Sequence, residues 1–198
     1  MTQIGLYFNQ ERCTGCYTCS IACKDWHDPD VGSDIISGAG SDSGTGNRMR
    51  LTITERGTFP DLFLSYLVVP CYHCQDAPCI KACPENAISK TESNGVVLVD
   101  RDKCTGKDVC GMLCRKACPY NSPQFGTREN AKMQKCDFCH DRLQNGLAPV
   151  CVEACPMYAL EIGPLDELRS KYGDSVEASG FRYSEKISPS VVLTPRKE

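Results

Sequence analysis

The amino-acid sequence predicts an α+β fold in which short strands and short helices carry loops rich in cysteine. The 198 residues contain 16 cysteines, and these fall into four groups of four along the chain. Between the groups lie only brief apolar segments separated by glycine, proline and asparagine, a pattern typical of short elements. A fourfold internal repeat is therefore the main organising feature of the chain.

The four groups share the spacing of their last two cysteines. Each group ends in Cys-x3-Cys, and in the last three groups a proline follows the final cysteine. In chain order the groups are Cys13, Cys16, Cys19 and Cys23; Cys71, Cys74, Cys79 and Cys83; Cys104, Cys110, Cys114 and Cys118; and Cys136, Cys139, Cys151 and Cys155. The first group has the spacing of bacterial ferredoxins, in which three thiolates hold one [4Fe–4S] cluster and the fourth ligates another. At four thiolates per cluster, the cysteine count predicts four clusters.

Short strands are expected around the first two groups. Residues 6–8 form an apolar segment just before the first group. Residues 49–54 alternate between apolar and polar side chains, which predicts a half-buried strand leading to the second group. Residues 87–90 and 96–99 flank the turn signal Asn94-Gly95, and we expect them to pair as a hairpin that joins the second group to the third.

The remaining segments predict two elements, a loop and a tail. Residues 158–162 are expected to form a strand after the fourth group, and residues 164–169 a helix with proline in its first turn. Residues 32–46 are rich in glycine, serine and aspartate, which indicates an exposed inserted loop without ligands. Residues 181–198 show little periodicity, which predicts a flexible tail or an arm that becomes ordered on a partner.

Spacing alone leaves the pairing of the groups open, but the short hairpin between groups two and three favours pairing these two. The predicted ligand sets are Cys13, Cys16, Cys19 and Cys155 for cluster A; Cys136, Cys139, Cys151 and Cys23 for cluster B; Cys71, Cys74, Cys79 and Cys118 for cluster C; and Cys104, Cys110, Cys114 and Cys83 for cluster D. The fold would then comprise two ferredoxin-like units. Residues 1–70 and 135–163 form an outer unit with clusters A and B, residues 71–134 an inner unit with clusters C and D, and residues 164–198 a C-terminal helix and partner-docking tail.

Other side chains near the cysteines are expected to surround the clusters, because the thiolates already supply four ligands to each. Three histidines are expected either to lie at the surface or to tune the cluster potentials: His27, His73 and His140. Aromatic residues that would shield the clusters from water are Tyr17, Trp26 and Tyr72. Basic residues that would offset the negative charge of the clusters are Lys24, Lys81, Arg115 and Lys116.

Charge and hydropathy exclude several classes of partner. With 22 basic and 25 acidic residues the net charge is −3, so nucleic acid is not an expected partner. The longest apolar run, residues 62–70, is much shorter than the roughly 20 residues of a membrane-spanning helix. Residues 1–10 lack the features of a secretory signal. The expected location is therefore cytoplasmic, or periplasmic or membrane-associated if a partner carries the chain through export.

Several motifs extend beyond the cysteines: Arg12-Cys13-Thr14-Gly15-Cys16, Ala22-Cys23-Lys24, Cys71-Tyr72-His73-Cys74, Ala77-Pro78-Cys79, Ala117-Cys118-Pro119-Tyr120, Lys135-Cys136-Asp137-Phe138-Cys139, Pro149-Val150-Cys151-Val152-Glu153-Ala154-Cys155-Pro156 and Gly163-Pro164-Leu165-Asp166-Glu167-Leu168. In these motifs the chain resembles, over nearly its full length, the iron–sulfur subunits of the dimethyl sulfoxide reductase family of molybdenum and tungsten bis-pterin enzymes. The resemblance implies a wire of four clusters between a molybdenum- or tungsten-pterin catalytic subunit and a membrane anchor or soluble redox partner. It also implies the ligand sets given above and no catalytic residue in this chain.

One group departs from the family pattern. The third group reads Cys104-x5-Cys110-x3-Cys114-x3-Cys118, whereas the usual subunit has Cys-x2-Cys-x2-Cys-x3-Cys-Pro. All four thiolates are present, so a [4Fe–4S] cluster D is still expected, with a potential or exposure that differs from its neighbours.

Other functions share parts of the same pattern. Within the class, the alternatives are the small subunit of a pterin-dependent aromatic hydroxylase or transhydroxylase, favoured by residues 55–60 and the third group, and an accessory subunit of a formate dehydrogenase or hydrogenase complex. Outside it, a free polyferredoxin and a zinc-stabilised interaction module remain. The Cys-x3-Cys-Pro endings favour iron–sulfur clusters over zinc, and the grouping of the cysteines disfavours a disulfide scaffold.

Overall fold

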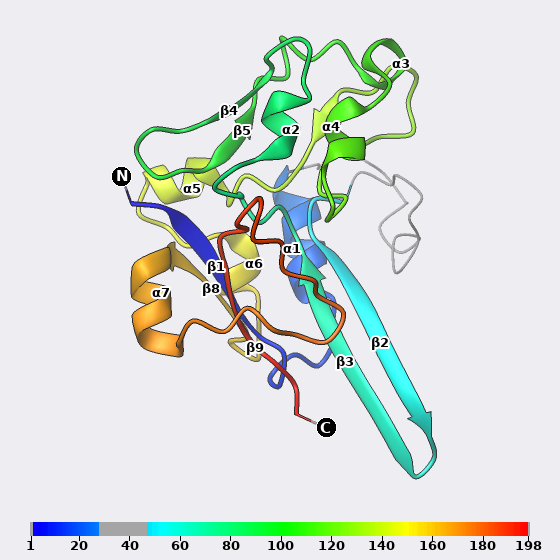
Figure 1. Cartoon of the computed structure of the whole chain (residues 1–198), viewed down its shortest axis with the longest axis vertical. Helices are drawn as coiled ribbons and strands as arrows, with labels where there is room; N and C mark the ends of the chain where they lie inside the picture. Colours follow the sequence, from blue (N-terminus) through cyan, green and yellow to red (C-terminus); the bar gives the residue numbers. More distant parts are fainter. Residues whose placement is uncertain (1, 28–46, 198) are drawn as a thin grey trace.

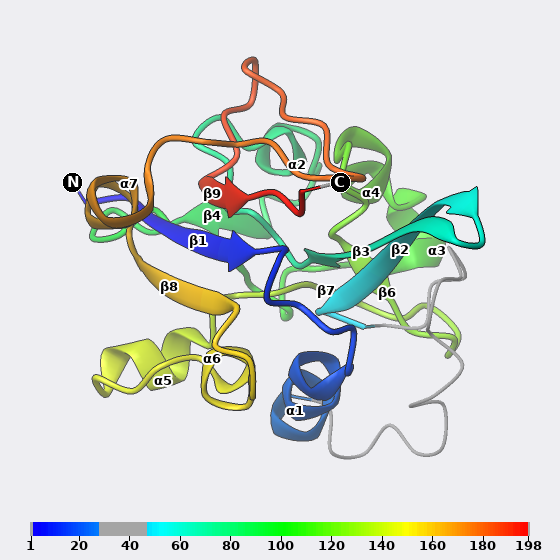
Figure 2. The same cartoon turned by 90° about the horizontal axis from the view of Figure 1, so that it is seen from below.

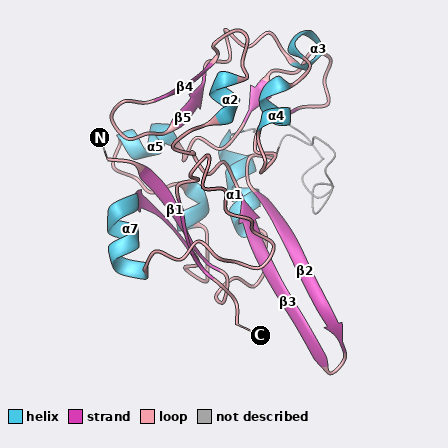
Figure 3. Ribbon diagram, in the orientation of Figure 1, coloured by secondary structure: helices cyan, strands magenta, loops and turns pink. Residues whose placement is uncertain are grey.

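The computed structural model describes residues 2–27 and 47–197, and the predicted loop over residues 32–46 lies outside them. The described residues form short strands and short helices, as the sequence predicts (Figure 3). The strands are β1 (Ile4–Asn9), β2 (Arg50–Thr58), β3 (Asp61–Val69), β4 (Ile88–Lys90), β5 (Val97–Val99), β6 (Gln124–Phe125), β7 (Met133–Gln134), β8 (Leu160–Pro164) and β9 (Val191–Thr194). The helices are α1 (Thr18–His27), α2 (Pro78–Lys81), α3 (Lys107–Cys110), α4 (Leu113–Ala117), α5 (His140–Gln144), α6 (Val150–Glu153) and α7 (Leu165–Tyr172).

A three-stranded sheet forms the centre of one half of the molecule (Figure 2). Its middle strand, β1, pairs antiparallel with β8 and parallel with β9. Side chains alternate across the sheet, so Leu6 and Phe8 enter the main core while Tyr7 faces helix α7. This sheet places the first cysteine group at the end of β1 and the fourth group before β8.

Helix α7 covers the outer face of this sheet. Leu165 and Leu168 pack against Tyr7 and Val192, and the ring of Tyr172 stacks on Tyr7 with 3.5 Å between ring centroids. The sequence prediction of a helix here is confirmed, except that Pro164 caps the helix as the last residue of β8. A proline suits this position because its missing N–H would have no partner within the helix.

The prediction of a flexible or partner-ordered tail over residues 181–198 is wrong for its last part. Residues Val191–Thr194 form strand β9, in parallel register with β1 from Leu6 opposite Val191 to Asn9 opposite Thr194. Val191 and Val192 are fully buried, and Leu193 is 1% exposed. The sequence did not predict this strand, because the segment contains proline and shows little periodicity. A strand of four residues is also too short for its pattern to be recognised.

Strands β2 and β3 form a long hairpin that projects from the body (Figure 1). The predicted strand is present, but it is half-buried only at its base. Leu51 is 4% exposed and belongs to the core, whereas Ile53 is 53% exposed. The alternation in sequence was correct, and burial stops because the hairpin leaves the body beyond Leu51.

The opposite half of the molecule carries the second and third groups. Here β4 and β5 pair antiparallel, which confirms the predicted hairpin, and helices α2, α3 and α4 lie around it (Figure 1). A second apolar cluster fills this half, and it includes Ile88, Val97, Phe125 and Met133. The first and fourth cysteine groups thus adjoin the sheet β8-β1-β9, and the second and third groups adjoin the hairpin β4–β5.

Candidate metal centres

All 16 cysteines lie among the described residues, and none of these forms a disulfide. The structure brings the thiols together across the groups. Cys13 and Cys19 lie close enough to Cys16 and Cys155 for their charges to interact. Cys151 neighbours Cys23, Cys136 and Cys139 in the same way. Two sites therefore form between the first and fourth groups, each with three thiols from one group and one from the other.

The second and third groups form two further sites in the same manner. Cys74 lies near Cys71, Cys79 and Cys118, and these four thiols line an apolar pocket. A second apolar pocket is lined by Cys83, Cys104, Cys110 and Cys114. We call the four places sites A, B, C and D, after the clusters predicted for the same four sets of cysteines.

Neighbouring sites are linked by thiols that lie near one another. Cys19 of site A lies close enough to Cys151 of site B for their charges to interact. The same is true of Cys136 of site B and Cys71 of site C, and of Cys79 of site C and Cys114 of site D. The sites therefore follow one another in the order A, B, C, D.

The loops share a backbone conformation that the cysteine spacing alone does not reveal. The second residue after the first cysteine of each group has a positive φ: +70° at Gly15, +44° at His73, +92° at Gly106 and +56° at Phe138. At Gly15 a side chain would overlap the ring of Tyr66, and at Gly106 it would overlap Asn130. Left-handed residues turn successive N–H groups toward one point, which is how backbone binds anions.

Backbone N–H groups accordingly point at sulfur. The N–H of Phe138 donates to Cys136 Sγ at 3.4 Å, that of Ala159 to Cys155 Sγ at 3.4 Å, and that of Met133 to Cys104 Sγ at 3.5 Å. Such donors stabilise thiolates and shift the potential of any cluster bound to them.

A second backbone conformation is repeated in the groups that have a proline after the last cysteine. In the last three groups the third residue after that cysteine has a positive φ: +49° at Asn86, +52° at Asn121 and +50° at Tyr158. Each of these residues donates its N–H to the carbonyl of that cysteine in a tight turn. In the first group Lys24 replaces the proline, and α1 continues to His27. The missing proline therefore lengthens one helix beside site B.

Burial sets the protonation of the free thiols. It raises the pKa of Cys19, Cys79, Cys114 and Cys136 to about 12 and that of Cys139 to about 11. Cys16 is exposed, and hydrogen bonds from Thr18 lower its pKa. Buried thiols of this kind become thiolates when metal replaces the proton, so metal binding here releases protons.

The third group reaches site D through an added turn. Its five residues between Cys104 and Cys110 contain most of helix α3, and this helix is fixed where Lys107 N–H donates to Ala131 O at 3.0 Å and Asp108 N–H to Asn130 Oδ1 at 3.2 Å. The expanded spacing therefore still delivers Cys110 to the cavity of site D.

Basic residues predicted to offset cluster charge differ in their placement. Lys81 is exposed and forms an ion pair with Asp76 at 2.6 Å, so its charge lies in solvent. Lys24 is buried beside Cys23. Lys135, which residue type alone did not single out, is 3% exposed, and its ammonium donates to Val97 O and to Cys136 O. The position of Lys135 directly before a ligand cysteine was the only sequence signal for a role near a cluster, and its burial is visible only in the fold.

Aromatic rings fill the space between sites B and C. His73 lies between Cys71 and Cys74, Phe138 lies between Cys136 and Cys139, and their ring centroids are 3.9 Å apart. Burial lowers the pKa of His73 well below its usual value, and its Nδ1 accepts the N–H of Val97 at 2.8 Å. Tyr72 is also buried, as predicted, whereas Trp26 is 46% exposed. The neutral rings exclude water where two sites meet.

These residues fit iron–sulfur clusters. Each site offers four sulfur donors, N–H groups point at several of the sulfurs, and sites C and D enclose apolar space. Thiolates at this spacing are the ligands of [4Fe–4S] clusters. The fold and the sites thus define a ferredoxin-type iron–sulfur protein.

Comparison with known proteins identifies the family. The model of the 4Fe-4S dicluster domain matches residues 62–165. The sequence is 40% identical over 197 residues to one of the chains of anaerobic dimethyl sulfoxide reductase from Escherichia coli, covering 98% of this protein and 89% of that one. It is 33% identical over 189 residues to one of the subunits of sulfite dehydrogenase from Allochromatium vinosum, covering 91% and 76%, and 33% identical over 198 residues to the thiosulfate reductase electron transfer subunit PhsB of Salmonella typhi, covering 99% and 93%. The protein belongs to this family of iron–sulfur electron-transfer subunits.

Proposed function

We propose that this chain is the relay subunit of an oxidoreductase complex, with four [4Fe–4S] clusters bound at sites A to D by the 16 cysteines. The observation that carries the proposal is the order of the sites. Thiols of site B neighbour those of A and of C, and thiols of site C neighbour those of D. Four clusters in such a row would carry an electron from one end of the molecule to the other.

In this transfer the protein holds the clusters in position, excludes water from the space between them and adjusts their reduction potentials. Each cluster, when bound, takes up and releases one electron. The cysteine loops fix its position, the rings of His73 and Phe138 exclude water between sites B and C, and the buried ammonium of Lys135 supplies positive charge there. Positive charge near two clusters favours their reduced forms, because reduction adds negative charge.

We further propose two ferredoxin-like units: an outer unit of residues 1–70 and 135–163 with sites A and B, and an inner unit of residues 71–134 with sites C and D. Two separate apolar clusters support this division. The larger contains Cys19, Cys23, Cys136 and Cys151, and the smaller contains Cys74, Cys79 and Cys114. Cys71, the first residue of the inner unit, packs in the larger cluster, so the two units meet at site C.

The proposed partner is a catalytic subunit with a molybdenum or tungsten pterin cofactor, with a membrane anchor or soluble redox protein at the other end of the row. The relatives are named as parts of dimethyl sulfoxide reductase, sulfite dehydrogenase and thiosulfate reductase, which supports a catalytic partner. Within residues 2–27 and 47–197 no helix has the length and apolar character to cross a bilayer. In this proposal any membrane anchor is a separate subunit of the complex, and this chain shares its location.

Metal and sulfide analysis of the natively purified complex, kept free of oxygen, tests the proposal. We expect about sixteen irons and sixteen acid-labile sulfides per chain, four of each per cluster, with molybdenum or tungsten near one per complex. About twelve irons or fewer would contradict site D, and zinc in place of iron would contradict the relay itself. A full iron count without molybdenum or tungsten would favour the free polyferredoxin. Nickel in the purified complex would favour a hydrogenase complex.

A further inference from the structure

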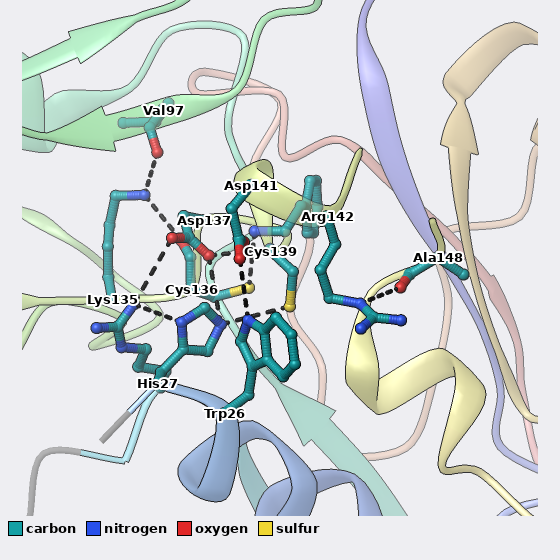
Figure 4. A network of polar contacts seen from close by, with 12 residues as sticks. Trp26, His27, Val97, Lys135, Cys136, Asp137, Cys139, Asp141, Arg142 and Ala148 are labelled. Carbon is teal, nitrogen blue, oxygen red and sulfur yellow. Dashed lines mark hydrogen bonds and ion pairs between the residues drawn. The ribbon is translucent and has the colours of Figure 1, made fainter. Parts of the chain in front are cut away.

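The extended helix α1 brings a histidine to site B. Because Lys24 replaces the proline found in the other groups, α1 runs on to His27, whose side chain lies beside Asp137 and Cys139 of the fourth group (Figure 4). Trp26 secures this end of the helix. Its Nε1 donates to Asp141 Oδ2 at 3.1 Å, and the guanidinium of Arg142 lies 4.8 Å from its ring centroid.

The tautomer of His27 follows from its neighbours. Nδ1 lies 3.3 Å from Arg48 Nη1, and an arginine side chain only donates hydrogen bonds. Nδ1 must therefore accept, which leaves the proton of the neutral ring on Nε2. Nε2 lies 3.4 Å from Cys139 Sγ and 3.7 Å from Asp137 Oδ1, so this N–H donates to the sulfur.

Surrounding groups hold the histidine in this position. Arg48 also lies 3.6 Å from Asp137 Oδ2, and Asp137 Oδ1 accepts the N–H of Cys139 at 2.9 Å. The side chains of His27 and Arg48 are 10% and 12% exposed. A hydrogen bond that water hardly reaches acts on the sulfur more strongly than one at the surface.

We propose that His27 is a positioning residue that tunes the cluster of site B by donating its Nε2–H to the sulfur of Cys139, an inference that rests on the proposed relay function. A donated hydrogen bond withdraws negative charge from the thiolate. Since reduction adds an electron to the cluster, the donor stabilises the reduced form and raises the reduction potential. Site B would thereby accept electrons more readily than it would with backbone donors alone.

Ligation of metal by His27 is the competing role. His27, Asp137 and Cys139 present ligand atoms within 4.8 Å of one another, which is a grouping that suits a metal ion. A ligating Nε2 would have no proton, and the ring's proton would then lie on Nδ1, facing the donor group of Arg48. The contact with Arg48 therefore favours donation to sulfur over ligation.

The test is a redox titration of the native complex, followed by electron paramagnetic resonance. In His27→Leu we expect one cluster to shift to a lower midpoint potential with the iron count unchanged. In His27→Gln, whose amide can donate, the shift should be smaller. His140→Leu is the matched comparison, because His140 adjoins Cys139 in sequence but its Nδ1 has no hydrogen-bond partner among the described residues, so the same substitution should shift the potentials less than His27→Leu. Pulsed spectra should also show a nitrogen coupling to the reduced cluster that His27→Leu abolishes.

Three results would overturn the inference: unchanged potentials in His27→Leu, an equal shift in His140→Leu, or loss of iron in His27→Leu, which would mark the residue as a ligand. These results are separable from failure of the relay function itself. That failure would appear as a low iron count in the unaltered complex, whereas the three results above are read only when the unaltered complex has its full iron count.

Discussion

Replacing Leu193 with alanine should lower the thermal stability of the protein markedly, although the residue lies close to the C-terminal end of the described residues. Leu193 is 1% exposed in β9 and packs in the main core with Leu6 and Phe8 of β1. Truncating a buried leucine to alanine costs about 2–5 kcal/mol, through lost burial and the cavity left behind. For a protein of this size each kcal/mol lowers the melting temperature by about 2–4 °C, so the expected decrease is about 4–20 °C.

The assay is loss of the visible cluster absorbance on heating the holoprotein without oxygen, with all variants at one heating rate because unfolding of a metalloprotein is rarely two-state. Leu62→Ala is the matched control. Leu62 is 52% exposed on the projecting hairpin, and the same truncation there should cost less than about 0.5 kcal/mol. If both variants melted at the same temperature, β9 would contribute nothing to the folded body, and the interpretation as a partner-docking arm would be right after all.

Three further predictions concern individual sites. Cys110→Ala should change one cluster alone, with a loss of about one to four irons per chain by metal analysis, and an unchanged iron count would contradict its place in site D. Gly15→Ala should impair cluster A, because the residue has a φ of +70° and a side chain would overlap the ring of Tyr66; a normal spectrum would show that the loop adapts. Partial burial raises the pKa of Glu161, but hydrogen bonds from Lys171 and Tyr172 outweigh it and lower the pKa overall. A lowered carboxyl pKa stabilises the fold above the unfolded value of about 4.3, and that contribution is lost as the pH falls through the folded pKa. The protection factors of the α7 amides, which are corrected for the intrinsic pH dependence of exchange, should therefore decrease in acid, and Glu161→Gln should remove this decrease.

The cysteine groups predicted the kind of site, because thiols in groups that end in Cys-x3-Cys are typical ligands of iron–sulfur clusters. Spacing alone left the pairing of the groups open, and the four ligand sets stay a prediction; in the structure Cys155 lies near Cys13. The hairpin β4–β5 and helix α7 were also predicted, because turn residues and capping signals act over a few positions. The strand of the C-terminal segment was not predicted, since its place beside β1 depends on residues almost the whole length of the sequence apart.

The sequence by itself determined the chemistry of this protein: 16 cysteines in four groups that each end in Cys-x3-Cys, with the proline after the last cysteine present in three groups and absent in one. Tertiary structure alone decided which buried charges and rings face the sites. Lys135 and Lys81 both lie near cysteines in sequence, yet one is 3% exposed and the other pairs with Asp76 in solvent. The same holds for His27, which reaches Cys139 only because α1 packs across the fourth group. Burial and long-range contact depend on how distant segments pack, and local sequence carries no direct record of that packing.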